Sequence, residues 1–330
     1  MLNRLRAIPG LHVSENARLA PHTRFGLGGP ALALIDAHTE SALAAAVRIL
    51  DGSQWTLIGG GSNLVVADEG FSGVVLRYVA PGIRVEGTQV EADSGVVLQD
   101  LVDHTLAKGL QGLETMTGIP GWLGGAVYGN AGAYGHSLHE LVESVRLFDG
   151  SSLRSISGPE CQFRYRESIF KQQKHWLILS AQLRMKHANT VELKAKADGI
   201  LKIRNEKYPP TMRCAGSIFK NLILSELPES VRQTVPGQVV REGKVPSAFF
   251  LEKIGAKGMI LGGIEVALYH ANLIYNTGNG TASEVRQLIE ILKVRVRESY
   301  GLILEEEVQY VGDAEKKDRL GSQQQSPNAG

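Results

Sequence analysis

The chain has 330 residues, of which 43% are hydrophobic and 21% charged, and its formal net charge is +1. This composition is typical of a globular protein of two or three domains, and the near-neutral charge gives no long-range attraction to nucleic acid or anionic membranes. No apolar run approaches the roughly 20 residues that a membrane span requires, no secretory leader pattern follows Met1, and Cys161 and Cys214 belong to no zinc motif. We therefore predict a cytoplasmic protein that has no metal site and binds neither nucleic acid nor membranes.

Periodicity and turn residues predict mixed strands and helices along the chain. In chain order we expect a strand at 31–35, a helix capped by Thr39, strands at 55–58 and 74–79, a hairpin over 84–92, a helix over 96–108, two strands joined by Asp149-Gly150, a strand at 176–185 and a helix over 191–207 ended by Pro209-Pro210. Beyond this break we expect a helix over 248–258, strands at Val266, 272–275 and 302–308, and a helix that opens with a capping box at Thr281 and runs through Val296. Residues 313–330 are polar, and we expect them to be disordered.

Two glycine-rich segments carry the strongest functional signal. Residues 118–135 contain seven glycines among large apolar residues, whereas a linker would mix glycine with serine and other polar residues. Gly59-Gly60-Gly61 directly follow the predicted strand at 55–58. Because glycine permits positive φ and a close approach of the backbone to a ligand, both segments are predicted to present N–H groups to a dinucleotide pyrophosphate. A tight turn between core elements is the alternative for 118–135, and it would explain only two or three of the glycines.

A third glycine cluster, residues 23–31, contains a formal G-x-G-x-x-A match. A Rossmann fingerprint needs a strand before this motif and a helix that opens inside it. Here Pro30 ends the cluster and a predicted strand follows, so we assign no Rossmann site to it. Residues 59–66 are likewise no Walker A loop, because no Gly-Lys-Ser/Thr follows the glycines.

Three polar segments are candidates for chemistry: residues 163–171, 215–221 and 304–310. The first packs cations around aromatic residues, the second is a small-residue turn, and the third places three glutamates in a predicted strand. Strand alternation would turn Glu306 to the face opposite Glu305 and Glu307. Taken singly, the three segments fit a solvated charge patch, a helix N-cap and an exposed edge strand.

Taken together and in order, these segments resemble one family, the flavin-dependent UDP-N-acetylenolpyruvoylglucosamine reductases (MurB), from about Asn16 to Gly312. The matching segments are 22–31 (opening signature), 58–64 and 118–135 (two flavin loops), 165–171 (catalytic arginine segment), 215–221 (proton-donor segment), and 262–263, 270–272 and 276–279 (substrate domain). Only one strand and one helix fit between Lys171 and Pro209, so the chain resembles the shorter form of the family, which lacks an extra tyrosine-bearing loop. Departures from the family pattern occur at Arg213, Cys214, Leu222 and Glu306.

The resemblance implies a mixed α/β and α+β fold, in which a two-subdomain FAD-binding fold of the vanillyl-alcohol-oxidase/PCMH type precedes a C-terminal α/β substrate-binding domain. The implied boundaries are 1–80 and 81–207 for the FAD-binding subdomains, 208–312 for the substrate-binding domain and 313–330 for the tail. The resemblance also implies NADPH as co-substrate and a non-covalent FAD, because Asn63 stands where related oxidases often carry a flavin-linked histidine. We expect a monomeric bacterial enzyme.

The resemblance further assigns roles to individual residues. Arg166 and Glu307 are expected to stabilise negative charge on the substrate, and Ser217 to deliver a proton to C2 after hydride has passed from NADPH through FAD to C3 of the enolpyruvyl group. Lys220 is a candidate helper of Ser217 only if residues 217–220 are helical. The expected substrate-binding residues are Tyr165, Lys207, Lys220 and Asn221. The expected cofactor-binding residues are Gly59, Gly60, Gly61, Ser62, Asn63, Leu64, Gly118, Ile119, Pro120, Gly124, Gly125, Ala126, Asn130 and Gly132.

The implied reaction is the NADPH-dependent reduction of UDP-N-acetylglucosamine enolpyruvate to UDP-N-acetylmuramate in peptidoglycan precursor synthesis. Two alternatives stay open. The first is an FAD-dependent oxidase or dehydrogenase of the same broad fold with another substrate, which the reaction of the reduced protein with oxygen would reveal. The second is a non-catalytic flavin- or nucleotide-sugar-binding protein, and the joint presence of Ser217, Arg166 and Glu307 argues against it.

Overall fold

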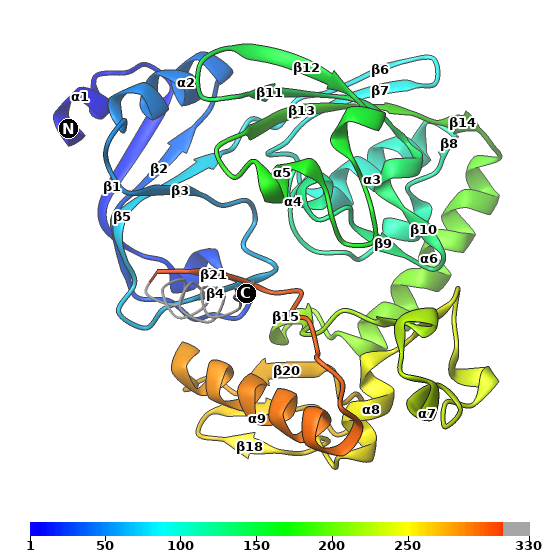
Figure 1. Ribbon diagram of the computed structural model, residues 1–330. Helices are drawn as coiled ribbons and strands as arrows, with labels where there is room; N and C mark the ends of the chain where they lie inside the picture. The colour runs from blue at the N-terminus through cyan, green and yellow to red at the C-terminus, as the bar shows by residue number, and fades with distance from the viewer. Residues whose placement is uncertain (313–330) are drawn as a thin grey trace, which may run out of the picture. The chain divides into compact units, whose positions relative to one another are not determined.

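The computed structural model describes residues 1–312 (Figure 1). The disorder predicted for 313–330 lies outside the described residues. The described chain divides into two compact units, and each is built from segments that are distant in sequence. Unit 1 comprises Met1–Glu15, Ala33–Gly61 and Gly73–Pro210. Unit 2 comprises Asn16–Leu32, Ser62–Ser72 and the chain from Thr211 onward.

The N-terminal sheet has four strands in the order β1-β2-β5-β3. Its strands are β1 (Leu11–Arg18), β2 (Pro30–Ala37), β3 (Trp55–Leu57) and β5 (Phe71–Tyr78). Helices α1 (Leu2–Arg6) and α2 (Glu40–Ile49) accompany it, and α2 begins where predicted, because the Thr39 hydroxyl accepts from Ala42 N at 3.1 Å. The strand predicted at 31–35 is confirmed within β2, so the cluster at 23–31 leads into a strand and is no Rossmann turn.

A five-stranded antiparallel sheet in the order β12-β11-β13-β7-β6 forms the larger part of unit 1 (Figure 1). Its strands are β6 (Ile83–Glu86), β7 (Gln89–Asp93), β11 (Val142–Phe148), β12 (Leu153–Ser157) and β13 (Leu177–Arg184). The predicted hairpin over 84–92 and the turn at Asp149-Gly150 are both confirmed, and Gly150 has the positive φ of +99° that such a turn favours.

Helices and short strands complete unit 1, and their apolar faces join one core with the five-stranded sheet. They are α3 (Leu98–Ala107), α4 (Leu123–Tyr128), α5 (Ile169–Gln172), α6 (Thr190–Lys207), β8 (Leu110–Gln111), β9 (Gly132–Ala133), β10 (His136–Ser137) and β14 (Lys186–His187). The helices predicted over 96–108 and 191–207 are confirmed. α3 ends just before Gly109, whose φ is +66°, and the side chain of Asn189 caps α6 by accepting from Val191 N and Glu192 N.

Glu114, in a 3₁₀ turn ahead of the second glycine segment, is a buried carboxylate. It accepts from Gly112 N at 2.6 Å and from Lys196 Nζ at 3.0 Å. Burial alone would raise the pKa of Glu114, but these hydrogen bonds act against it and the net shift of the pKa is downward. A depressed pKa stabilises the fold above the pKa of the unfolded carboxyl, and this contribution is lost as pH falls through the folded pKa.

We therefore expect Glu114→Gln to lower the free energy of unfolding at pH 7 by about 1–2 kcal/mol. The difference in free energy of unfolding between variant and wild type should shrink as the pH falls below about 4, because the Glu114 carboxyl is then protonated first in the unfolded and then in the folded protein. Urea unfolding at a series of pH values measures this, with Glu298→Gln on an exposed position of the helix Ala282–Tyr300 as control. A difference that does not change with pH would contradict the role assigned to the carboxylate charge.

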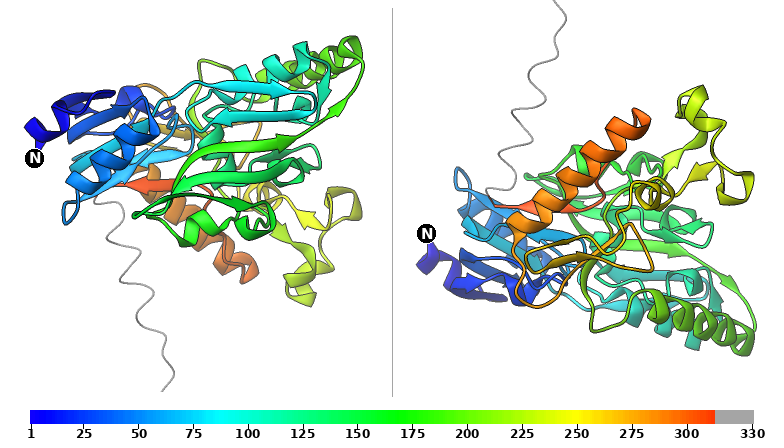
Figure 2. Two further views of the ribbon diagram at one scale, coloured as in Figure 1. Left: turned by 90° about the horizontal axis from the view of Figure 1, so that it is seen from above. Right: turned by 90° about the horizontal axis from the view of Figure 1, so that it is seen from below.

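Unit 2 is built on a four-stranded antiparallel sheet in the order β15-β20-β19-β18. Its strands are β15 (Arg213–Ser217), β18 (Ile260–Leu261), β19 (Ile264–Val266) and β20 (Leu273–Asn276). The other elements of the unit are α7 (Glu229–Arg232), α8 (Ser247–Lys253), α9 (Ala282–Tyr300), the antiparallel pair β16 (Leu222–Ile223) and β17 (Lys244–Val245), and the parallel pair β4 (Leu64–Val66) and β21 (Gln309–Val311). Helix α9, the long orange helix in Figure 2, packs against β18 and β19 of this sheet.

Side-chain hydrogen bonds join the N-terminal segments of unit 2 to α9 and β20. The capping box of α9 at Thr281 and Glu284 is confirmed, and the carboxylate of Asp68 accepts from Ala282 N at 2.8 Å and from Ser283 N at 2.9 Å. The helix runs past the predicted Val296 to Tyr300, where Gly301 ends it with φ +66°. Asn276 Nδ2 donates to Phe25 O at 3.1 Å, so the 22–31 signature packs on β20.

Two predictions for unit 2 are wrong in extent. The strand expected at 302–308 is an extended segment whose one bridge joins Glu306 to Phe219, and the strand of this region is β21 at 309–311. Alternating burial there reflects packing against α9 and the core of unit 2 rather than membership of a sheet. The helix expected over 248–258 ends at Lys253, because Gly255 already takes φ +73°.

Candidate active site

The glycines of the first predicted flavin loop lie beside the second loop within unit 1. A Cβ built on Gly59 would stand 4.0 Å from Gly125 N and 4.0 Å from Trp122 Cβ. A Cβ built on Gly60 would stand 2.9 Å from Trp122 Cδ1, closer than real Cβ atoms come, and 3.1 Å from Gly121 Cα, tighter than most real contacts. Glycine at 60 is therefore required by the packing of one turn on the other, and the tertiary structure joins two segments that are distant in sequence.

The backbone donors of the two loops are used differently. In the second loop, Gly118 N donates to Gln99 Oε1 at 2.7 Å, Ile119 N to Met116 O at 2.9 Å and Gly124 N to Ser94 O at 2.8 Å. These groups shape the loop, and their N–H groups are already bonded within the protein. In the first loop, the N–H groups of Gly59, Gly60 and Gly61 donate to no acceptor among residues 1–312. The three consecutive N–H groups of the first loop are thus available to a ligand, as are those of Gly121, Trp122 and Gly125 in the second loop.

The residues present fit a flavin dinucleotide. Successive N–H groups at the first loop suit a pyrophosphate, and a Cβ at Gly125 would meet no atom within 4 Å, so space is left beside the loop. Pro120 and Ala126 complete the second loop around α4. Sequence reasoning missed Trp122, which forms the contact between the loops. The Trp122 ring lies 5.8 Å from the Arg77 guanidinium carbon, and Arg77 is held by two 2.6 Å hydrogen bonds to Asp36.

The arginine segment lies against the second loop, also within unit 1. Arg166 occupies a left-handed backbone position, with φ +56°, and its Nη2 donates to Gly132 O at 2.8 Å. Its guanidinium carbon is 5.4 Å from the centre of the Tyr165 ring. Lys207 is the last residue of α6, with Nζ 5.2 Å from the centre of the Tyr208 ring.

In unit 2 the structure brings Ser217 and Glu307 onto adjacent segments. Ser217 is the last residue of β15, and the next carbonyl, Ile218 O, accepts from Glu307 N at 2.7 Å. Asn63 lies beside them, because its Nδ2 donates to Glu307 O at 2.8 Å and its carbonyl accepts from Gln309 N at 2.9 Å. Ser62 and Leu64 flank Asn63, and Leu64 begins β4, which pairs with β21. A predicted flavin-loop residue thus fixes the segment of a predicted catalytic acid.

Lys220 does not meet the condition set for a helper of Ser217. Residues 213–217 are a strand and residues 218–220 continue without helix, so a three-residue spacing does not bring the two side chains to one helix face. Lys220 is 8% exposed and forms an ion pair with Glu305, and its N–H donates to Glu305 O at 2.9 Å. Asn221 follows it and is half-buried.

The side chains of Glu305 and Glu306 have different partners, as expected for neighbours that face opposite ways, although the segment is not a strand. Glu306 accepts from Lys293 Nζ at 2.9 Å and from the hydroxyl of Tyr310, whereas Glu305 pairs with Lys220. Glu306 is therefore a structural acid that ties this segment to α9.

Asn272 is a positioning residue for the Ser217 segment that the sequence matched to the family without a role. It is 3% exposed, its Oδ1 accepts from Phe219 N at 2.9 Å, and its Nδ2 donates to Phe219 O and to Ser247 Oγ, both at 2.8 Å. The residues around Asn272 in the sequence do not indicate that its side chain joins Phe219 to Ser247. Only its place in the 270–272 match singled it out.

Residues 1–312 contain neither a candidate membrane span nor a candidate metal site. Across this range no helix is both long and apolar enough to cross a membrane. In the same part of the chain no group of three or more His, Cys, Asp or Glu side chains is placed to hold a metal ion.

Comparison with known proteins identifies both regions of the chain. Residues 31–152 match the family model of an FAD binding domain, and residues 208–311 match that of the C-terminal domain of UDP-N-acetylenolpyruvoylglucosamine reductase. These matches support the expected architecture of an FAD-binding fold followed by a substrate-binding domain.

Proteins similar to this chain over most of their length are UDP-N-acetylenolpyruvoylglucosamine reductases. The chain is 55% identical to the UDP-N-acetylenolpyruvoylglucosamine reductase of Solibacter usitatus over 94% of this chain and 100% of that protein. It is 33% identical to the Bacillus subtilis reductase over 91% of this chain and 94% of that protein. The crystal structure of the MurB reductase from Thermus caldophilus superposes with a TM-score of 0.73 at 27% identity, covering 91% of this chain and 99% of that one. The chain belongs to the UDP-N-acetylenolpyruvoylglucosamine reductase family.

Proposed function

We propose that this protein uses NADPH and FAD to reduce the enolpyruvyl group of UDP-N-acetylglucosamine enolpyruvate, giving UDP-N-acetylmuramate for peptidoglycan precursors. The observation that carries the proposal is the 55% identity to the Solibacter usitatus reductase, which spans that protein completely. The two glycine loops of unit 1 support it, because they present backbone donors beside an open space.

FAD, when bound, transfers hydride between NADPH and the enolpyruvyl group. The chain's own residues handle charge and protons. The planar guanidinium of Arg166 suits the substrate carboxylate, on which negative charge develops during reduction. Ser217 donates the proton to C2 of the substrate. Gly216 precedes it with φ +77° and no atom within 4 Å of a built Cβ, so the backbone beside the hydroxyl is open.

Glu307 is proposed as the second stabiliser of the developing charge. Its backbone is fixed on both sides, since its N–H donates to Ile218 O and its carbonyl accepts from Asn63. The position of its backbone relative to that of Ser217 is therefore set by the fold of unit 2. Tyr165, Lys207, Lys220 and Asn221 are proposed to bind the substrate, with Lys207 and Asn221 at the nucleotide diphosphate.

The proposal extends to organisation and location. We propose FAD-binding subdomains at 1–80 and 81–207, a substrate-binding domain at 208–312, a monomer in solution, and a location in the bacterial cytoplasm. Sedimentation of the purified full chain tests the monomer.

The function is tested with the purified full-length protein under anaerobic conditions. NADPH should reduce the bound flavin, and the enolpyruvyl nucleotide should then reoxidise it with one equivalent of product formed. An oxidase of the same fold would instead be reoxidised rapidly by oxygen and would ignore the enolpyruvyl nucleotide. That second pattern would replace the proposed function by the alternative.

The cofactor site has a matched pair of test positions. Gly125 and Gly199 are both helical glycines whose built Cβ meets no atom within 4 Å. Each should accept an aspartate without disturbing the fold, but only Gly125 lies at the glycine loops. We expect Gly125→Asp to give folded, colourless protein, because its carboxylate repels the pyrophosphate, and Gly199→Asp to stay yellow. Flavin absorbance and circular dichroism measure both, and a yellow Gly125→Asp protein with unchanged flavin affinity would refute the loop assignment.

A further inference from the structure

The turn that carries Arg166 is strained. Arg164 N donates to Glu167 O at 3.0 Å and Glu167 N donates to Arg164 O at 3.1 Å, which closes a four-residue turn with Tyr165 and Arg166 at its centre. Arg166 has φ +56°, a conformation that favours glycine or asparagine at this place in a turn. A side chain as large as arginine is held there only when surrounding contacts outweigh the local cost.

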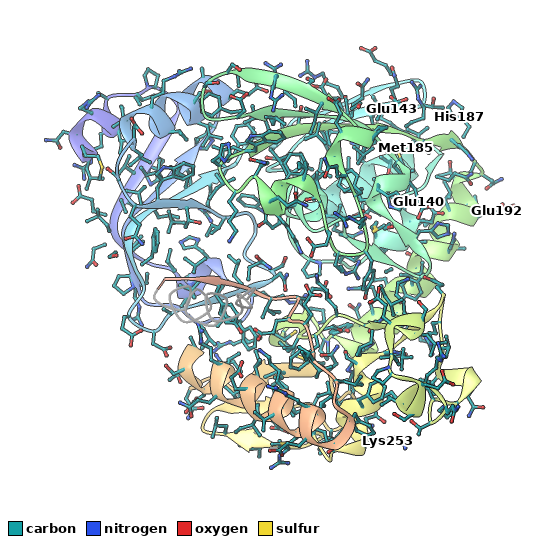
Figure 3. The ribbon with its side chains drawn as sticks, in the orientation of Figure 1. Glu140, Glu143, Met185, His187, Glu192 and Lys253 are labelled. Carbon is teal, nitrogen blue, oxygen red and sulfur yellow. The ribbon has the colours of Figure 1, made fainter. Side chains whose placement is uncertain are left out.

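Asn130 supplies contacts of this kind. Its side chain is buried, with 2% of the residue exposed. Its Nδ2 donates to Arg164 O at 2.8 Å, and its Oδ1 accepts from His139 N at 3.1 Å. His139 belongs to the 3₁₀ turn Leu138–Glu140, which is itself closed by a capping box between Ser137 and Glu140, the latter labelled in Figure 3.

The amide of Asn130 has one orientation that fits both neighbours. Rotation by 180° would set its oxygen against Arg164 O and its NH₂ against the His139 N–H, so both bonds would be lost. Asn130 has φ +42°, which asparagine tolerates better than most residues. Its own carbonyl lies 3.5 Å from Arg166 Nη1, and Gly132 O accepts from Arg166 Nη2 at 2.8 Å. The carbonyl of Arg164 and the guanidinium of Arg166 thus both contact the short segment 130–132.

We propose that Asn130 is a positioning residue for Arg166, which holds the strained turn against the second glycine loop so that the guanidinium points in one direction. Both polar ends of its buried side chain bond to protein, so we assign its amide to the arginine turn rather than to the flavin. Lys171 assists from the other side, because its Nζ donates to Arg166 O at 2.5 Å. The catalytic role that this proposal gives to Arg166 rests on the proposed function, whereas the geometry of the turn does not depend on it.

Asn130→Asp is the sharpest test. Aspartate keeps the shape, the acceptor for His139 N and the tolerance of positive φ, but it replaces the donor to Arg164 O with a carboxylate oxygen, which repels that carbonyl. Asn16→Asp is the matched control, because Asn16 is exposed and has φ +48°. Asn130→Gly, which also accepts positive φ, is the second variant if Asn130→Asp does not fold.

Three readouts separate positioning from other roles. We expect Asn130→Asp to slow flavin reoxidation by the enolpyruvyl nucleotide by about 10- to 100-fold, since a misplacement near 1 Å can cost that much, while reduction by NADPH and flavin affinity stay near wild type. In an Arg166→Ala background the same substitution should cause no further slowing. Hydrogen exchange of the holoenzyme should become faster in the peptide covering residues 164–167 and stay unchanged in α3.

The contrary results are equally distinct. Weaker flavin binding with equal slowing of both half-reactions would make Asn130 a cofactor-binding residue and overturn the proposal. A full additional loss in the Arg166→Ala background, or unchanged exchange at 164–167, would overturn it as well. If wild type and Asn16→Asp also fail to reduce the enolpyruvyl nucleotide, the proposed function fails, and the exchange measurement alone still decides whether Asn130 holds the turn.

Discussion

Ser217→Ala should slow the reduction of the enolpyruvyl nucleotide by about 10²–10⁴-fold, the usual loss when a positioned acid is removed. The reduction of FAD by NADPH should stay near the wild-type rate, because the serine hydroxyl is needed only for the proton at C2. The backbone of Ser217 pairs with Leu273 in the sheet, and alanine keeps this pairing, so the fold should be unchanged. Stopped-flow measurement of the two half-reactions gives both rates.

Ser230→Ala is the control for this experiment. Ser230 lies exposed on α7, in the same unit, where alanine is a good helix former. It should match wild type in both half-reactions. Equal slowing of both half-reactions by Ser217→Ala would show that Ser217 supports the fold and does not act as the proton donor.

Glu307→Gln should lower turnover by about 10²–10³-fold, equivalent to about 3–4 kcal/mol of lost transition-state stabilisation. The backbone bonds of residue 307 to Ile218 and Asn63 do not involve its side chain, so the substitution tests the carboxyl alone. Flavin absorbance should be unchanged. Steady-state kinetics with the enolpyruvyl nucleotide measure the loss.

Its neighbour provides the matched control. Glu306→Gln removes a carboxylate from the ion pair with Lys293, so it should lower thermal stability while turnover stays near wild type. The two isosteric substitutions therefore have opposite signatures, one in catalysis and one in stability. Near-normal turnover in Glu307→Gln would remove this residue from the site and favour another oxidoreductase activity on the same fold.

Many local structures of this protein could be predicted from its sequence alone. The Thr39 cap, the capping box at Thr281, the Asp149-Gly150 turn and the hairpin over 84–92 depend on contacts between near neighbours, so short patterns predicted them correctly. The glycine loops were visible for the same reason, because positive φ and close packing leave few residues other than glycine. The family, and with it the FAD-binding fold, could be inferred from the order of these motifs.

The tertiary structure decided which of these groups act on one another. No spacing rule shows that Trp122 packs on Gly60, that Asn63 fixes the carbonyl of Glu307, or that Asn272 bridges Phe219 to Ser247. The segment at 302–308 alternates like a strand, yet its backbone bonds to Ile218 and Lys220 are set by the fold of unit 2. Contacts between residues far apart in the chain depend on how the whole core packs, and a local pattern carries no information about the partner. The sequence therefore determined which side chains are available for chemistry, and only the packed structure determined which neighbours hold them in place.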